Sequence, residues 1–467
     1  MSAREPLSFS NGSRVKPTTE LASSSEKQIN AAHIRALKKV GLFSFVFVMY
    51  SYNTAGPFGL EDQIRTSGPG MALLYQLFIP LFWCIPISLV AAELTTAMPV
   101  EGGFYRWTRE AFGDFWGFLA GWWNWCASFL LGGAYAVLFT DNIAHYIPRL
   151  TPVQHYLMSV AVIAVIAYVN VRGIRLVGRV ATVLELSILA VVLVMCIVSI
   201  RMWHRNPFLP FVPPHQPVFQ VFGVGFALGL WLYAGYEQVS SVAEEVENPQ
   251  RSYPQALACV VPLSIATYVL PTACVLASVG KWEQWHDGFF SEAAGLIGGP
   301  WLGFAMTLAA TFTALSILNS TVLTTTRMPF AMAEDGYLSP TLAKTHSKFG
   351  TPWLAIVLSA GVYCLVAWHS LSQLISVYIW LRIATSILTV LSAWRLRRKR
   401  PDLPRTFGIP WGRRGLAYAV IAPLLMSGVA MIASDKFALR WGPVVLLFGP
   451  LAYFLFRRKK DDQPIQS

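Results

Sequence analysis

The chain has 467 residues, of which 55% are hydrophobic and 13% are charged, and its mean hydropathy is +0.49. Soluble proteins carry roughly twice that share of charged residues, so the composition excludes an ordinary soluble domain. The net charge of +12 does not point to nucleic acid, because the basic residues lie between apolar runs, as the orientation signals of a membrane protein do.

The N-terminal residues 1–34 contain no long apolar run. They are rich in Ser, Thr and charged residues and lack the apolar core of a signal peptide. We predict a disordered cytoplasmic tail here, a transmembrane domain over residues 35–457, and a short second cytoplasmic tail over residues 458–467.

Long apolar runs recur along the rest of the chain. In lipid, backbone N–H and C=O groups find no partner outside their own segment, so such runs fold as helices. Spans of about 20 residues fit twelve times into this length, and we predict an all-α membrane protein with twelve transmembrane helices. The predicted spans are 36–56, 71–97, 113–147, 154–171, 180–202, 218–243, 256–279, 298–331, 353–369, 371–394, 415–433 and 440–456. Residues 280–297 are expected to form an outer loop.

Positive charge sets the predicted orientation. Lys and Arg gather in segments such as 172–179, 395–400 and 457–460, whereas the loops on the opposite side hold few. Because basic residues favour the cytoplasmic side, we predict a multi-pass protein of the plasma membrane, embedded in the lipid bilayer, with both termini in the cytoplasm.

The first predicted span contains the helix-breaking stretch Gly56-Pro57-Phe58-Gly59. Proline has no N–H and clashes with the preceding turn, and glycine adopts non-helical angles at little cost. A break here leaves N–H groups free at the positive end of a second half-helix, where a carboxylate binds. The substrate-binding residues predicted at this break are Asn53, Thr54, Ala55, Gly56, Pro57, Phe58, Gly59 and Glu61.

A second break is predicted in the sixth span at Gly235. An isolated glycine in a membrane helix usually packs against a neighbouring helix. The prediction of a break at Gly235 therefore depends on where the sixth span lies in the predicted repeats. The first and sixth spans would open two five-helix repeats, and paired breaks in two repeats mark a midplane binding site. A proline kink and a packing glycine are the alternative. The substrate-binding residues predicted here are Trp231, Tyr233, Ala234, Gly235, Tyr236 and Glu237.

Trp231 lies one turn before the second break and is the predicted gate. Its ring can close over an amine through cation–π attraction. The alternative is a packing or interfacial role, because most of the 17 Trp residues must have one.

Three glutamates in or beside the predicted spans are candidates for a functional role. Ionisable groups at membrane depth usually line a cavity, so Glu237 is predicted to hold an ammonium group or to exchange a proton. Glu61 has the same two possible roles, or it compensates the helix dipole. Glu185, in the fifth span, is predicted to relay protons, because burial favours proton uptake by a carboxylate. The alternative is that it pairs with Arg179 or another basic residue at the inner end of the span.

Four sequence blocks, in order, resemble the amino acid–polyamine–organocation transporter superfamily over residues 35–400. The first looks like the first-helix signature of its plant and protozoan polyamine uptake branch, and the chain resembles that branch and the L-type amino acid branch most. The blocks are Gly56-Pro57-Phe58-Gly59-Leu60-Glu61-Asp62; Ala92-Glu93-Leu94 with Pro99, Gly102, Gly103, Tyr105 and Phe112-Gly113; Glu244-Glu245-Val246-Glu247-Asn248-Pro249-Gln250-Arg251 with Pro254; and Arg327 with Ala333-Glu334-Asp335-Gly336-Tyr337-Leu338.

The resemblance implies a LeuT-like fold, a five-plus-five inverted repeat followed by two more helices, with helices 1 and 6 discontinuous. Repeat one would cover about 35–203, repeat two about 217–395, and helices 11 and 12 about 412–457. The resemblance also implies that the backbone from Ala55 to Gly59 and from Trp231 to Gly235 grips the substrate.

Two positions depart from the pattern of the superfamily. Polyamine carriers often hold an aspartate in helix 3 after a Trp-x-Trp element, and here Trp123-Asn124-Trp125 is followed at that place by Leu131. Some amino-acid relatives place a lysine in helix 5 in lieu of a sodium ion, and here the matching position is Ile188.

We therefore expect a secondary active transporter of amino acids or related amines, working by alternating access and either proton-coupled or exchanging. The alternative is a polyamine (putrescine or spermidine) uptake transporter. We expect no enzyme, cofactor or metal site, because the eight His residues show no metal-ligand spacing. Two further alternatives are a channel, which would pass ions without substrate, and a receptor, which would bind a ligand without transporting it.

Overall fold

The computed structural model describes residues 39–54, 56–144, 147, 150–214, 218–368, 371–433 and 436–456. The predicted tails, 1–34 and 458–467, lie outside these residues. The described chain is helical and contains no β-strand; its one isolated bridge joins Val40 and Val246.

Nine helical stretches of the described chain are long and apolar enough to cross a membrane. They are α4 (Pro69–Ile79) with η1 (Pro80–Cys84) and α5 (Ile85–Ala97), α7 (Asp114–Ala144), α8 (Pro152–Val171), α9 (Ile174–Ser199) with η2 (Ile200–Met202), α11 (Pro249–Ser278), α13 (Pro300–Thr325) with α14 (Arg327–Glu334), α16 (Leu371–Lys399), α17 (Gly412–Ile432) and α18 (Lys436–Phe456).

Shorter helices complete the described chain. They are α2 (Leu42–Asn53), α3 (Glu61–Ser67), α6 (Phe104–Phe112), α10 (Val218–Leu232), α12 (Phe289–Gly298), α15 (Trp353–Val366), and the 3-10 segments η3 (Gln238–Glu245), η4 (Trp282–Gln284) and η5 (Pro340–Ala343). Three of them, α2, α12 and α15, are apolar but short. The number of twelve membrane crossings stays a prediction.

The stretch 280–297, expected to be a loop, is largely helical, and that expectation was wrong. Helix α12 runs between Gly288 and Gly299, both of which have positive φ. Its apolar side chains, among them Phe290 and Ala294, are buried, and α12 packs along α13. A spacing of four residues places such side chains on one helix face, which explains why a helix forms here.

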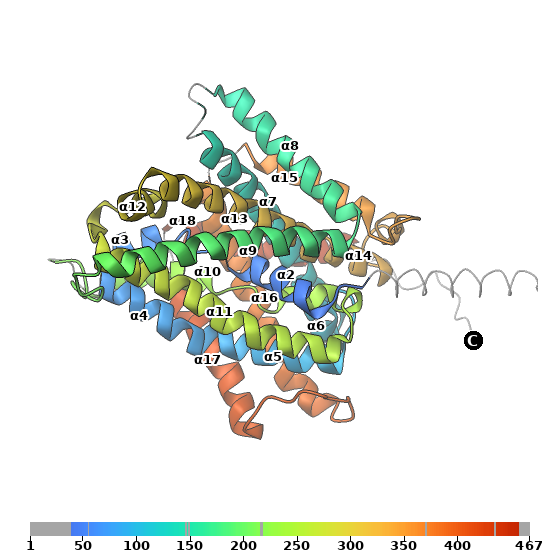
Figure 1. The fold of residues 1–467 in the computed structure, drawn as a ribbon. Coiled ribbons are helices and arrows are strands. Elements are labelled where there is room, and N and C mark those ends of the chain that lie inside the picture. The colour runs from blue at the N-terminus through green and yellow to red at the C-terminus, as the bar shows by residue number, and fades with distance from the viewer. Residues whose placement is uncertain are drawn as a thin grey trace, which may run out of the picture. The chain divides into compact units, whose positions relative to one another are not determined.

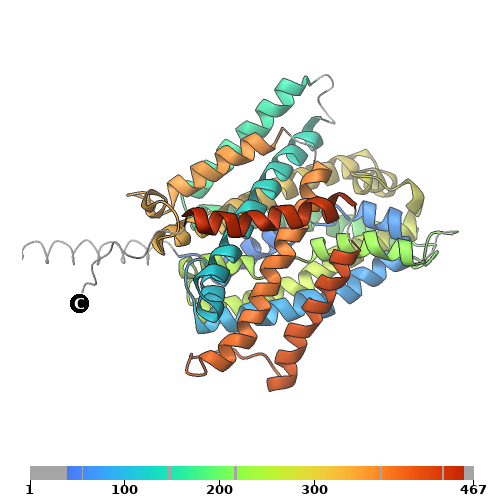
Figure 2. The same cartoon turned by 180° about the vertical axis from the view of Figure 1, so that it is seen from behind.

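The centre of the bundle is built by α7, α13 and α16. Helix α7 packs against both α13 and α16, and α13 also packs against α9 (Figure 1). Helices α8 and α15 pair at one edge, whereas α17 and α18 both pack on α16, as the view from behind shows (Figure 2).

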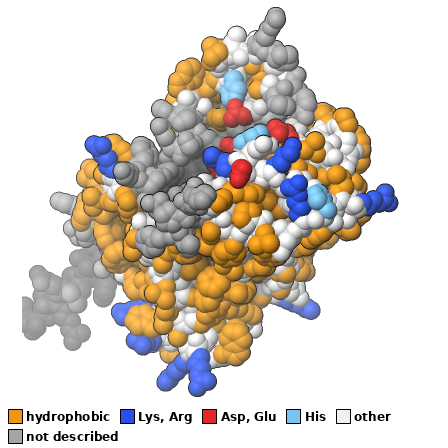
Figure 3. All heavy atoms as spheres, turned by 90° about the vertical axis from the view of Figure 1, so that its left-hand side faces the viewer, with side chains coloured by type: hydrophobic (Ala, Val, Ile, Leu, Met, Phe, Trp, Pro, Cys, Tyr) orange, Lys and Arg blue, Asp and Glu red, His pale blue; other side chains and the backbone are white. Residues whose placement is uncertain are grey.

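The surface at the end where α3 and α12 lie is rich in apolar side chains (Figure 3). Charged side chains gather toward the middle of this face, and hydrophobic side chains surround them. Many large apolar side chains on the outer helices are exposed, including Val183, Leu193 and Leu365. Exposed apolar surface on this scale suits contact with lipid rather than with water.

Candidate functional site

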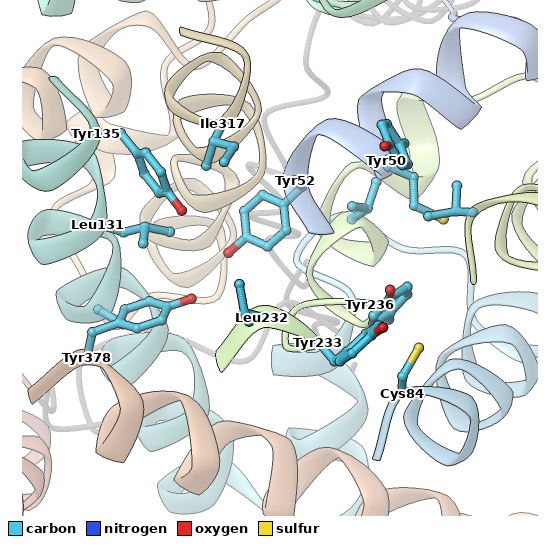
Figure 4. Packing of buried hydrophobic residues seen from close by; sticks show 14 of the residues in the cluster. Tyr50, Tyr52, Cys84, Leu131, Tyr135, Leu232, Tyr233, Tyr236, Ile317 and Tyr378 are labelled. Atoms are coloured by element: carbon cyan, nitrogen blue, oxygen red, sulfur yellow. The ribbon is translucent and has the colours of Figure 1, made fainter. Parts of the chain in front are cut away.

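A small cavity lies between α2, α7, α10, α11, α13 and α16. Its volume is about 30 Å³, which is room for one or two water molecules. The lining residues are Tyr52, Asn53, Thr54, Leu131, Tyr135, Trp231, Leu232, Ala234, Tyr268, Ile317 and Tyr378. Figure 4 shows Tyr52 between the side chains of Tyr135, Ile317, Leu232 and Tyr378.

The first side of the cavity is the end of α2. This helix stops at Asn53, and Gly56 and Gly59 follow with φ of 65° and 86°, before α3 starts at Glu61. These angles are open to glycine and strained for other residues. The Gly59 N–H donates a hydrogen bond to Glu61 Oε2 at 2.8 Å, so the Glu61 carboxylate sits at the positive end of α3.

The second side is the end of α10. Its last helical residue is Leu232, and Gly235 has a φ of 120° before η3 starts at Gln238. A Cβ atom on Gly235 would lie 2.8 Å from the ring of Tyr52 and 3.0 Å from Asn53 Oδ1. The end of α10 therefore touches the end of α2, and glycine is required for this approach.

Four of the predicted binding residues line the cavity: Asn53, Thr54, Trp231 and Ala234. Asn53 donates its amide to the Met49 carbonyl, and its buried Oδ1 has no hydrogen-bond partner among the described residues. Ala55 lies outside the described residues. The predicted residues that do not line the cavity are Gly56, Pro57, Phe58, Gly59, Glu61, Tyr233, Gly235, Tyr236 and Glu237.

Tyr233 and Tyr236 point away from the cavity, toward Cys84 (Figure 4). The Tyr233 hydroxyl donates to the Gln76 carbonyl at 2.9 Å. Both side chains are fully buried and hold the chain after α10 against the α4–α5 segment.

Sequence reasoning missed the tyrosines of the cavity. Tyr52, Tyr135, Tyr268 and Tyr378 come from four different helices, and Tyr268 donates its hydroxyl to the Leu232 carbonyl at 3.0 Å, in the last turn of α10. A tyrosine hydroxyl inside an apolar span needs a partner when buried, which is a usable signal. Nothing in the sequence says which of the 17 tyrosines share one cavity.

Glu237 is buried in an ion pair that the sequence analysis did not anticipate. Its Oε1 accepts from Arg382 at 2.8 Å and from the Ser386 hydroxyl at 2.7 Å. Arg382 also donates to Asn124 Oδ1 at 3.2 Å. The signal was Arg382 itself, a basic residue inside a predicted span, because such residues pair or line a cavity.

Glu185 is buried on α9, and none of the ion pairs among the described residues includes it. The predicted alternative, a pair with Arg179, is therefore absent from the described structure. The hydroxyls of Ser51 and Ser316 face the carboxylate, yet neither oxygen accepts a regular hydrogen bond. Ser51 instead bonds Ser316 and Ser320, at 2.8 and 2.7 Å between hydroxyl oxygens.

Neither acidic nor basic side chains line the cavity in the described chain. The described residues also contain no cluster of His, Cys, Asp and Glu that could hold a metal ion. The cavity offers aromatic faces, hydroxyls, one free amide oxygen and backbone at two helix ends. Such a surface suits a small organic solute.

Comparison with known proteins assigns the family. The family model described as "Amino acid permease" matches residues 38–452. A probable polyamine transporter of Arabidopsis thaliana is 32% identical over 426 residues, covering 90% of this chain and 87% of the relative. The polyamine transporter PUT1 of Oryza sativa subsp. japonica is 29% identical, covering 85% and 74%.

The fold also matches that of a solved transporter structure. The crystal structure of MhsT in complex with L-phenylalanine superposes with a TM-score of 0.62, covering 83% of this chain and 98% of the other, at 16% identity. This similarity concerns the fold alone and supports the LeuT-like architecture expected from the sequence. The family match over residues 38–452 and the 32% identity with the Arabidopsis relative show that this chain belongs to the amino acid permease family of membrane transporters.

Proposed function

We propose that this protein carries an amino acid or a related amine across the plasma membrane by alternating access, with both termini in the cytoplasm. The observation that carries the proposal is the meeting of two helix ends, at Asn53 and Leu232, on one buried cavity. Helix ends expose main-chain N–H and C=O groups, and these can replace the water around a charged solute.

The two ends suit the two charged groups of an amino acid. The backbone N–H groups of the break at Gly56–Gly59 can bind the substrate carboxylate if it displaces the Glu61 carboxylate, which now accepts from the Gly59 N–H. An ammonium group is favoured by the carbonyls that end α10 and by the free Oδ1 of Asn53. Because the cavity measures only about 30 Å³, side chains must move to admit such a substrate.

Trp231 is the side chain that we propose as the gate. It lines the cavity, and its ring packs over Gly59, 3.5 Å from the place of a Cβ atom there. We propose that a rotation of this ring, which lies against Gly59 at the first break, opens the cavity to the substrate. The breaks lie at the starts of two proposed repeats, about 35–203 and 217–395.

Proton coupling is part of the proposal, and Glu185 is its stronger candidate. Glu237 is neutralised by Arg382, whereas Glu185 has no basic partner among the described residues. A bare carboxylate charge at membrane depth is costly, and a bound proton removes that cost. Release of the proton would accompany the movement of α9 against α2 and α13, which carry Ser51 and Ser316.

Polyamine transport is the second candidate, and it is favoured by the names of the relatives in Arabidopsis and rice. The absence of acidic residues from the cavity lining in the described chain weakens it. A diamine has no carboxylate to place at the first break, so that half of the site would be unused.

Uptake into proteoliposomes tests the proposal. The purified protein is reconstituted, and uptake of labelled leucine, phenylalanine, arginine and putrescine is measured with an inward proton gradient and without one. We expect saturable uptake of at least one amino acid, faster with the gradient. Uptake equal to that of empty liposomes for all four solutes would reject the transport proposal, and strict dependence on sodium would reject proton coupling.

A further inference from the structure

The pair between Glu237 and Arg382 lies within one helical turn of the cavity. Arg382 is four residues after Tyr378 on α16, so both side chains lie on the same face of the helix. Tyr378 lines the cavity, and its hydroxyl lies near Tyr52 and Arg382. The pair therefore forms the layer of side chains directly behind the cavity wall.

This pair is fully enclosed. The exposed fractions of the two side chains are 3% for Arg382 and 0% for Glu237. Ser386 donates to the carboxylate oxygen that also meets Arg382, and Asn124 accepts from the second guanidinium nitrogen. Two helices, α7 and α16, and the chain after α10 thus hold the two charges together, and their sum is zero.

We propose that this neutral pair sets the substrate class: a zwitterionic amino acid with an uncharged side chain, rather than a polyamine. The inference rests on the proposed transport function and narrows it. Glu237 is the acidic residue next to the cavity wall that could attract a cationic substrate. Its carboxylate is already paired with Arg382. Arg382 is a specificity-determining residue that acts through Glu237 and not through contact with substrate.

The charges of the two substrate classes explain the preference. An amino acid brings one carboxylate and one ammonium group, so it adds no net charge to a cavity without charged residues. A diamine brings two ammonium groups, and each needs an acceptor. To use Glu237, a diamine would have to displace Arg382 and leave a guanidinium buried without a partner, which is strongly unfavourable.

Two other buried acidic residues, Glu61 and Glu185, do not change the expected preference for a zwitterionic amino acid over a diamine. Glu61 is occupied by the Gly59 N–H at the start of α3, and it does not line the cavity. Glu185 faces Ser51 and Ser316, and it does not line the cavity either. The aromatic walls offer cation–π attraction to one ammonium group, which is not enough for a molecule that carries two.

The first experiment uses the wild-type protein in detergent. Binding of leucine, phenylalanine, arginine, putrescine and spermidine is measured by competition against whichever labelled solute the protein binds. We expect an uncharged amino acid to bind at least about tenfold more tightly than putrescine, a difference of about 1.4 kcal/mol. Putrescine binding as tight as that of the best amino acid overturns the inference while the transport proposal stands. Binding of none of the five, with no uptake, rejects the transport proposal instead.

The second experiment frees the carboxylate. Arg382→Gln leaves Glu237 unpaired, and we expect the affinity for putrescine, relative to leucine, to rise about tenfold or more (about 1.4 kcal/mol). The matched control is the double variant Glu237→Gln with Arg382→Gln, which keeps the net charge at zero and should keep the wild-type ranking. An equal gain of putrescine affinity in both variants overturns the inference, as does no gain in either. If Arg382→Gln does not fold, the wild-type ranking alone decides.

Discussion

Glu185 is a buried acidic residue without a basic partner in the described chain. It is 1% exposed on α9, and no basic side chain compensates it in the described chain. The groups that face Glu185 are the hydroxyls of Ser51 on α2 and Ser316 on α13, and the Tyr50 hydroxyl also lies near its carboxylate. Glu237 shows the opposite arrangement, because Arg382 holds it at 2.8 Å. A proton-coupling role therefore suits Glu185 better.

We predict that Glu185→Gln removes the response of uptake to an inward proton gradient. The amide resembles a carboxyl that is permanently protonated, so the variant keeps the packing but exchanges no proton. Uptake with and without the gradient should become equal, whereas the wild type should gain severalfold from it. The measurement is initial uptake into proteoliposomes at two outside pH values.

The control for this prediction is Glu292→Gln, because Glu292 is on α12 and its side chain is 60% exposed. Its uptake should follow the wild type at both pH values. A full gradient response in Glu185→Gln would exclude Glu185 as the coupling residue.

Glu101 is a second acidic residue whose protonation should depend on pH in the folded protein. It lies in the turn between α5 and α6, where its N–H donates to Glu244 and the next N–H, of Gly102, donates to the Ser241 carbonyl. Burial, followed by the nearby charge of Glu245, raises the pKa of Glu101 to about 8. The contact between this turn and η3 therefore favours the protonated form of Glu101.

We predict that the folded protein loses stability through Glu101 as the pH rises. An exposed glutamate titrates near 4.5 and Glu101 near 8, so the folded state keeps its proton over this range while the unfolded state loses it. The loss begins near pH 4.5, is complete above pH 8, and is on the order of 5 kcal/mol. The Tm of Glu101→Gln, relative to the wild type, should therefore rise between pH 5 and pH 8.5. A constant Tm difference across this range would contradict the assignment.

At the scale of elements, the interruption after α10 depends on one glycine. Gly235 has a φ of 120°, and the space for a Cβ atom is filled by Tyr52 and Asn53. The same contact brings the end of α2 to the cavity, so the conformation of one break depends on that of the other. We expect the two breaks to act as a pair for this reason.

We predict that Gly235→Ala impairs transport more than it impairs folding. The strained backbone should cost about 2 kcal/mol, and the methyl group should push Tyr52 into the cavity. Uptake should fall at least about tenfold, since each 1.4 kcal/mol corresponds to a factor of ten. Initial uptake and Tm are measured on the same preparation.

The matched control is Gly361→Ala in α15, where an added Cβ meets no atom within 4 Å. This variant should transport like the wild type. Equal uptake by Gly235→Ala and Gly361→Ala would show that the approach of the two helix ends is dispensable.

At the scale of the whole molecule, α17 and α18 are part of the packed bundle. Both contact α16, and Trp123 of α7 donates its indole N–H to the Leu446 carbonyl on α18 at 3.0 Å. Gly442 lets α18 approach the ring of Trp380, which lies 2.3 Å from the position of a Cβ atom. Because α16 also carries Tyr378 and Arg382, α18 supports the cavity wall from outside.

We predict that Gly442→Leu separates α18 from α16 and destabilises the protein. Overpacking at a close helix contact costs about 1–3 kcal/mol, so the Tm should fall and the protein should elute heterogeneously in gel filtration. Gly428→Leu in α17 is the control, because its Cβ meets nothing within 4 Å. A sharp, unshifted elution peak and an unchanged Tm for Gly442→Leu would contradict this role of α18.

The sequence by itself determined the features that depend on neighbours along the chain. Runs of apolar residues located the helices, since each membrane helix satisfies its own backbone. Gly56, Pro57 and Gly235 pointed to the places where helical geometry ends, because their effect on the backbone is local. The family resemblance rested on short blocks of the same kind.

Only the tertiary structure decided which distant side chains meet. Glu237 and Arg382 are separated by 145 positions, and the tyrosines of the cavity come from α2, α7, α11 and α16. Periodicity shows which face of a helix is buried but not which helix it faces, because packing partners depend on the arrangement of the whole bundle. For the same reason the sequence could neither exclude Arg179 as the partner of Glu185 nor reveal Arg382 as the partner of Glu237.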